Sequence, residues 1–111
     1  MLPNSDVSVD TKRNLNEVAN NIFHGKDRFL REVRKAEQMG IRLVILIEHG
    51  HGIDSIEKVR DWKNQYGKVQ GKTVEWRMRT MYLNYGVEWQ FCEKKDTGRR
   101  ILEILKEGRY K

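Results

Sequence analysis

The sequence predicts a small α/β domain in which helices cover a parallel or mixed sheet. Three short stretches have the composition of strands, beginning near Val7, Ile41 and Val87, and apolar residues at helical spacing fill the segments between them. Two strands that run in the same direction need a long connection, so helical crossovers are typical of a parallel sheet. The expected order is β-α-α-β-α-α-β-α, within a single domain that spans residues 1–111.

The first strand and two helices are expected before residue 41. Residues 7–11 alternate small apolar and polar side chains, which predicts a short strand. The first helix should be interrupted at residues 24–27, and the second should end near Gly40 in a left-handed cap. The apolar residues that recur at helical spacing form the expected inward faces of these helices: Leu15, Val18, Ala19, Ile22, Phe29, Leu30, Val33 and Ala36.

The clearest strand lies at residues 41–47 (IRLVILI). It is apolar at nearly every position, as expected for a central strand covered on both faces. Glu48 should begin the loop that follows it. Asp54 and Glu57 then resemble the start of a helix. The helix is expected to turn Ile56, Val59 and Trp62 inward.

The last third should contain a helix, a strand and a final helix. Residues 64–71 are typical of an exposed loop, Thr73 is the expected helix cap, and Gly86 ends that helix. Residues 87–92 alternate, which predicts a strand with one apolar face. The two helices are expected to bury the residues that recur at spacings of three or four: Val74, Met78, Met81, Tyr85, Ile101, Leu102, Ile104 and Leu105.

Composition favours a polyanionic partner. The chain has 22 basic and 16 acidic residues, a net charge of +6, and counterion release makes such a surface attractive to nucleic acid; a merely solvated basic surface is the alternative. Cys92 is the single cysteine, so no internal disulfide can form. No apolar run is long enough for a spanning helix, and the first ten residues lack the features of a signal peptide. We therefore expect a cytoplasmic protein with no membrane partner.

The triplet Asp10-Thr11-Lys12 carries the clearest chemistry. Residues i and i+2 of a strand project from the same face, so Asp10 and Lys12 should lie together. A carboxylate is the kind of ligand that Mg²⁺ prefers, and an ammonium can orient water and offset charge on a phosphate. The same triplet is also common by chance, as an exposed ion pair at the end of a strand.

The residues around the triplet resemble a known family, the XPF-type branch of the PD-(D/E)XK nucleases. Its pattern is G-D, a gap, E-R-K-x-x-x-D, an R-F/L segment, and a strand that ends in L-I-E. Here Asp10-Thr11-Lys12 matches the triplet, Arg28-Phe29 the R-F segment, and Leu46-Ile47-Glu48 the end of the strand. Later fragments, including Tyr85-Gly86-Val87 and Phe91-Cys92, are similar to phage and bacterial members, so the resemblance covers most of the chain.

The resemblance implies a restriction-endonuclease-like three-layer sandwich that binds Mg²⁺ or Mn²⁺ and cuts branched or junction DNA as a homodimer. It places Asp10, Lys12 and Glu17 in the catalytic set. Asp10 is the expected metal ligand, and Asp6 could substitute for the family's upstream aspartate. Glu48 is either a further acid beside the metal, as the resemblance implies, or a carboxylate that faces water at the end of its strand. Lys12 would position the attacking water.

The chain departs from the family pattern at three points. The family's G-D aspartate lies on an upstream strand, whereas only Asp6 precedes Asp10 here, so we expect an N-terminally truncated member that lacks this strand. The acid that follows the lysine is replaced by Asn16, with Glu17 one position later; Glu17 either takes that role or merely solvates the helix. The triplet begins with Asp10 where the family has the longer Glu.

Several cations are candidates for contact with DNA, namely Arg13, Arg28, Lys94, Lys95, Arg99 and Arg100. Arg28 matches the family's arginine and could hold the scissile phosphate by two hydrogen bonds. The last four residues flank the start of the final helix, where a phosphate could bind the backbone N–H groups of Thr97 and Gly98. The alternative is a charge run screened by acidic neighbours. Trp76 could stack on an unpaired base, or could pack in the core or an interface.

The function expected from these residues is metal-dependent hydrolysis of DNA phosphodiester bonds. One alternative is a catalytically inactive DNA-binding module that keeps the nuclease fold. Another is a protein-interaction domain that uses an exposed sheet edge, since unpaired strand edges recruit partners.

Overall fold

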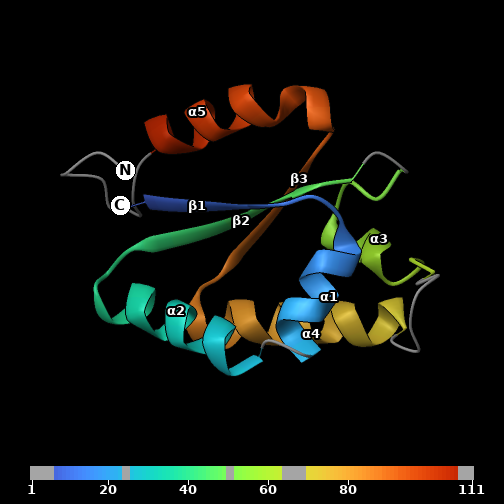
Figure 1. Cartoon of the computed structure of the whole chain (residues 1–111), viewed down its shortest axis with the longest axis horizontal. Helices are drawn as coiled ribbons and strands as arrows, with labels where there is room; N and C mark the ends of the chain where they lie inside the picture. Colours follow the sequence, from blue (N-terminus) through green and yellow to red (C-terminus); the bar gives the residue numbers. More distant parts are fainter. Residues whose placement is uncertain (1–6, 24–25, 50–51, 64–69, 108–111) are drawn as a thin grey trace.

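Helices lie on both sides of a three-stranded parallel sheet in the computed structural model, which describes residues 7–23, 26–49, 52–63 and 70–107 (Figure 1). The strands are β1 (Val7–Lys12), β2 (Arg42–Glu48) and β3 (Glu88–Cys92). The α-helices are α1 (Leu15–Phe23), α2 (Lys26–Gln38), α3 (Ile56–Val59), α4 (Gly71–Tyr85) and α5 (Thr97–Glu107), and a short 3₁₀ turn, η1 (Lys94–Asp96), precedes α5. The predicted α/β class and the predicted order of strands and helices are confirmed.

The strand order is β1-β2-β3, so β2 is the central strand, as its apolar sequence predicts. Both pairings are parallel, with Val7 opposite Arg42 and Val44 opposite Glu88. Residues opposite each other in a parallel pair share a face of the sheet. This register places Asp10 and Lys12 of β1 on the same face as Ile45 and Ile47 of β2.

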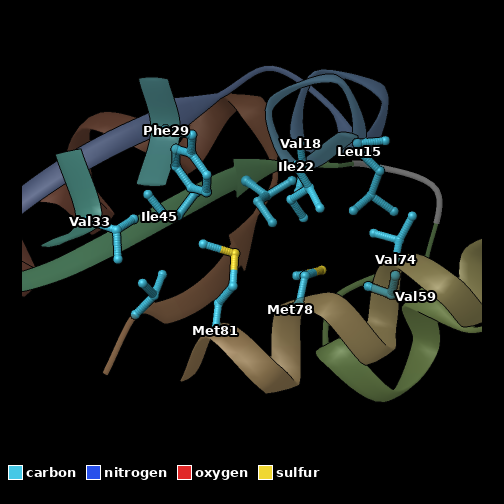
Figure 2. Packing of buried hydrophobic residues seen from close by; sticks show 13 residues of the cluster. Leu15, Val18, Ile22, Phe29, Val33, Ile45, Val59, Val74, Met78 and Met81 are labelled. Atoms are coloured by element: carbon cyan, nitrogen blue, oxygen red, sulfur yellow. The ribbon is translucent and has the colours of Figure 1, made fainter. Parts of the chain in front are cut away.

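The larger hydrophobic core fills the space between this face and the helices α1, α2 and α4. In α1 all four predicted inward residues are buried, and in α2 Phe29 and Val33 are buried with Leu30 packed beside them. Figure 2 shows Met78 and Met81 of α4 pointing toward β2. The indole Nε1 of Trp89 donates a hydrogen bond to the Met78 carbonyl (2.8 Å), which ties β3 to this helix.

The opposite face carries a smaller core that α5 covers alone among the described helices (Figure 1). Its buried residues are Val7, Val44, Leu46 and Ile104. The predicted burial of Leu102 and Leu105 is wrong: their side chains are 61% and 37% exposed. The small face of a three-stranded sheet meets one stripe of α5, and that stripe consists of Ile101 and Ile104.

An ion-pair network supplements the small core. Arg42 is buried on the α5 side, where its Nη2 donates to Glu88 Oε1 (2.9 Å) on β3 and to Glu107 Oε2 (3.2 Å) on α5. The hydrogen bond with Glu88, opposed by burial and aided by the one with Glu107, raises the pKa of Arg42 above its ordinary value. The guanidinium therefore joins the central strand, an edge strand and the covering helix.

Some predicted boundaries shift. Gly40 and Gly86 have the expected left-handed conformation, with φ of 68° and 72°. Thr73 is not the cap of α4, because the helix begins at Gly71, with Gln70 as its N-cap. Gly71 is required there by a close approach: an added Cβ would lie 2.3 Å from the carbonyl oxygen of Val59.

Two more boundaries differ. Glu48 belongs to β2 and does not start the following loop. Trp62 follows α3 and still packs against the larger core. Of the predicted break between the first two helices, residues 24–25 lie outside the described residues, whereas Lys26 and Asp27 belong to α2. Residues 64–69 of the predicted loop are likewise outside the described part of the chain.

Candidate functional site

The end of β1 brings Asp10 and Lys12 together, as their spacing predicts. Lys12 Nζ lies 3.1 Å from Asp10 Oδ2. The Lys12 side chain is only 12% exposed, whereas that of Asp10 is 40% exposed. The Asp10 carboxylate is therefore accessible to a ligand, whereas the Lys12 ammonium beside it is largely buried.

Asn21 of α1 completes the setting of Lys12. Lys12 Nζ donates to Asn21 Oδ1 (3.4 Å), and Asn21 Nδ2 donates to the backbone carbonyl of Glu17 (2.7 Å). The amide is thus anchored to its own helix while its oxygen faces the ammonium. Asn21 is not among the site residues predicted from the sequence. The available signal was its position one helical turn after Glu17, on the flank of α1 beside the apolar face.

Glu17 and Arg13 form the start of α1. The Glu17 N–H donates to Asn14 Oδ1 (2.9 Å), and the Arg13 N–H donates back to Glu17 Oε2 (3.2 Å). These reciprocal bonds resemble a capping box, which satisfies free donors at a helix N-terminus. The Arg13 side chain also pairs with Glu17 (3.3 Å) and is 85% exposed. Arg13 and Glu17, both predicted for the site, therefore also stabilise the N-terminus of α1.

A pocket of about 660 Å³ opens above these residues. Arg28 lies at its rim: the side chain is 86% exposed, and its Nε lies 4.0 Å from Glu32 Oε1. The structure thus gathers four predicted residues around one pocket. Its full lining is Asp10, Lys12, Glu17, Asn20, Asn21, Arg28, Phe29 and Glu32.

Glu48 is not brought to this pocket. It lies opposite Cys92 on the α5 side of the sheet, and its carboxylate accepts a hydrogen bond from the Thr97 hydroxyl. Asp10 and Lys12 project from the other face, so Glu48 does not share their surroundings. The remaining metal candidate, Asp6, lies outside the described residues.

The cations predicted around the last helix are also on the α5 side. Lys95 pairs with Glu93 (3.3 Å) and Arg99 with Asp96 (3.3 Å). Arg100 contacts Glu103 and Glu107 on its own helix, at 3.4 and 3.6 Å. Three of the four cations are thus screened by acidic neighbours. Lys94, in η1, is the fourth.

The pocket offers oxygen donors of the kind that hard cations bind. Mg²⁺ in proteins is commonly held by one or two carboxylates together with water and substrate phosphate. The accessible carboxylate of Asp10, with Glu17 and the Asn20 amide nearby, fits that donor set. Within the described ranges, no group of three or more His, Cys, Asp or Glu side chains is placed to hold a metal ion by itself.

Within the described part of the chain, no helix is long and apolar enough to cross a membrane. Comparison with known proteins finds no matching family model, no matching curated protein and no matching solved structure.

Proposed function

We propose that this protein is a metal-dependent DNA endonuclease that hydrolyses phosphodiester bonds. The observation that carries the proposal is the Asp10–Lys12 pair, 3.1 Å apart at a pocket whose rim carries Arg28. Together these residues supply a carboxylate, a held ammonium and an exposed guanidinium for one phosphate group. The net charge of +6 favours a polyanionic substrate. The resemblance in sequence adds branched DNA and a homodimer, which remain predictions.

The proposed cofactor is Mg²⁺ or Mn²⁺, held by Asp10 with Glu17 or Asp6 as helpers. When bound, such an ion supplies electrophilic stabilisation of the phosphate and makes water a better nucleophile. Glu48 is left out of this set because it lies across the sheet.

Two cationic residues of the pocket, Lys12 and Arg28, have proposed tasks in the hydrolysis. In this reaction a bond forms between water oxygen and phosphorus, and the bond from phosphorus to the leaving sugar oxygen breaks. Lys12, held between Asp10 and Asn21, donates hydrogen bonds to the incoming water or to a phosphate oxygen on which charge develops. Arg28 reaches over the rim as a planar donor and fixes the phosphate by two hydrogen bonds.

The second candidate is a DNA-binding module that has this pocket but does not cut. Two observations favour it. The Glu17 carboxylate is engaged in the start of α1, and Glu48 is hydrogen-bonded to Thr97 on the other face. Of the acids predicted for catalysis or metal binding, Asp10 would then be the one that remains accessible at the pocket within the described residues.

The test is a cleavage assay on linear, flap and four-way DNA with Mg²⁺ or Mn²⁺. Lys12→Ala should reduce the rate of cleavage by about 100- to 1000-fold, because the loss of one hydrogen-bond donor to the charge that develops in the transition state has an effect of that size. The matched control is Lys106→Ala, which removes the same charge from an exposed position on α5. Cleavage that persists in Lys12→Ala would refute the assignment.

Binding is measured on the same substrates, in parallel. A wild-type protein that binds DNA without cutting it would support the second candidate. A wild-type protein that binds no DNA at low salt would contradict both candidates. That result would favour the alternative of a protein-interaction domain.

A further inference from the structure

The guanidinium of Arg77, on α4, lies close to two aromatic rings. Its guanidinium carbon is 5.8 Å from the ring centroid of Phe23, at the end of α1, and 5.4 Å from that of Trp76. The residue is half-buried. Stacking against rings fixes the plane of a guanidinium and leaves its N–H edge available for hydrogen bonds.

Arg77 differs from the other half-buried and buried arginines in its lack of an acidic partner. Arg42 pairs with Glu88 and Glu107, and Arg100 pairs with Glu103. Among the described residues, no carboxylate forms an ion pair with Arg77, although it is partly removed from water. A cation that is held in place and lacks an acidic partner is suited to bind an external anion. The planar fork favours phosphate, which it can contact by two hydrogen bonds.

Trp76 adds a flat apolar surface at the same place. Its side chain is 60% exposed although Arg77 stacks on the ring, so a large part of the indole faces solvent. An exposed aromatic ring beside a phosphate-binding cation is the usual arrangement for holding an unpaired nucleotide, because every base has a face that can stack. A duplex offers no such face, since its bases are already stacked.

The site adjoins the pocket of Asp10 and Lys12. A smaller pocket of about 130 Å³ lies between α1, α2 and α4, and Arg77, Thr80 and Asn84 contribute polar groups to its lining. Asn21 and Phe29 line both pockets. A strand bound at Arg77 can therefore continue past Asn21 toward Lys12.

We infer that Arg77 and Trp76 form a binding site for an unpaired nucleotide of single-stranded DNA. Arg77 takes the phosphodiester group and Trp76 stacks on the base. The direction of the bound strand toward Lys12 rests on the proposed nuclease function, whereas binding itself does not. The probe is therefore chosen to report binding without cleavage.

The experiment is fluorescence anisotropy of a labelled 12-nucleotide oligothymidylate, titrated with the full chain in the absence of divalent metal. Trp76→Ala should weaken binding by about 5- to 100-fold, the effect of losing one base–aromatic stack. Trp76→Phe keeps a ring and should lose much less. Tyr82→Ala is the matched control, because Tyr82 is an aromatic residue on the same helix with 55% exposure and, among the described residues, no arginine stacked on its ring. This variant should bind as the wild type does.

Arg77→Gln tests the phosphate contact separately. It should weaken binding and reduce the slope of log affinity against log salt by about 0.7, as expected for one lost contact to a single strand. Circular dichroism melts confirm that each variant is folded. A blunt-ended 12-base-pair duplex made of two separate strands has no unpaired bases, and Trp76→Ala should leave the affinity for this duplex unchanged.

The proposal is overturned if the wild type does not bind the oligonucleotide, or if folded Trp76→Ala and Arg77→Gln bind it as tightly as the wild type. An equal loss in Tyr82→Ala would also overturn it, since the effect would not belong to this site. If the Trp76 dependence is found but no substrate is cut with Mg²⁺, this binding site stands and the nuclease proposal fails. If DNA is cut and neither variant alters binding, the nuclease proposal stands and this inference fails.

Discussion

The two faces of the sheet are held by different means. The face toward α1, α2 and α4 has a large apolar core that includes Ile45 and Ile47 and carries the Asp10–Lys12 pocket at its edge. The face toward α5 has four buried apolar residues and the ion-pair network around Arg42. The pocket therefore lies on the side of the sheet that has the larger apolar core. On the α5 side a smaller apolar core and the Arg42 ion pairs together hold the helix.

The largest expected effect comes from cavities in β2. Ile45 and Leu46 are adjacent, almost completely buried, and point to opposite faces. We expect Ile45→Ala to lower the free energy of unfolding by about 3–5 kcal/mol, and Leu46→Ala by about 2–3 kcal/mol. The cavity left by Ile45→Ala is enclosed by several helices. The cavity left by Leu46→Ala faces α5, which can shift to fill part of it.

Urea denaturation of the two variants measures this difference. Leu102→Ala is the control, because its exposed side chain should contribute less than about 0.5 kcal/mol. Equal losses at Ile45 and Leu46 would contradict the comparison between the two faces.

The next effect concerns Arg42. Arg42→Met should cost about 2–3 kcal/mol, because Glu88 would be left partly buried without its cation. The double variant Arg42→Met with Glu88→Met should recover much of this loss, since an apolar pair of similar volume can replace an ion pair. The measurement is the denaturant midpoint of each variant, which compares the stability of the double variant with that of Arg42→Met. If the double variant is less stable than Arg42→Met, the ion pair does more than neutralise the buried charges of Arg42 and Glu88.

The smallest effect is a surface ion pair. A hydrogen bond from Lys58 and its positive charge lower the pKa of Asp54 below 3.8. Because the folded-state pKa is depressed, the stabilisation is present above pH of about 3.8 and is lost as the pH falls through the folded value. An NMR titration of the Asp54 carboxyl should give a midpoint below 3.8, and Lys58→Gln should return it there. Lys63→Gln should leave it unchanged.

The sequence predicted the side chains that alternation within one strand determines. Asp10 and Lys12 project together because their spacing of two is fixed by the strand itself. Glu48 was placed correctly near the end of the central strand, yet its face depends on the register between β1 and β2. Register comes from the packing of the whole sheet and is not written in either strand alone. For this reason the family resemblance grouped Glu48 with residues that lie on the opposite face of the sheet.

The prediction that α5 buries Leu102 and Leu105 was wrong for a similar reason. The residues at positions 101, 102, 104 and 105 are all apolar, and periodicity alone marks them as one inward face. How much of that face is covered depends on the surface it meets, and three short strands meet only Ile101 and Ile104. Asn21 was missed because its position one helical turn after Glu17 does not by itself distinguish an amide that contacts another element. Its role follows from the position of Lys12 in another element.

The strand order has a consequence for how the chain acquires its structure. β2 pairs with strands that are both distant in sequence, Val7 opposite Arg42 and Val44 opposite Glu88, so no two neighbouring strands can form a hairpin. Each pairing must close a long loop before any of its contacts are gained, which slows folding. Until β3 is added, the apolar strand β2 keeps one edge open to other chains. Refolding should therefore be slow for a chain of this length, and its yield should fall as the protein concentration rises.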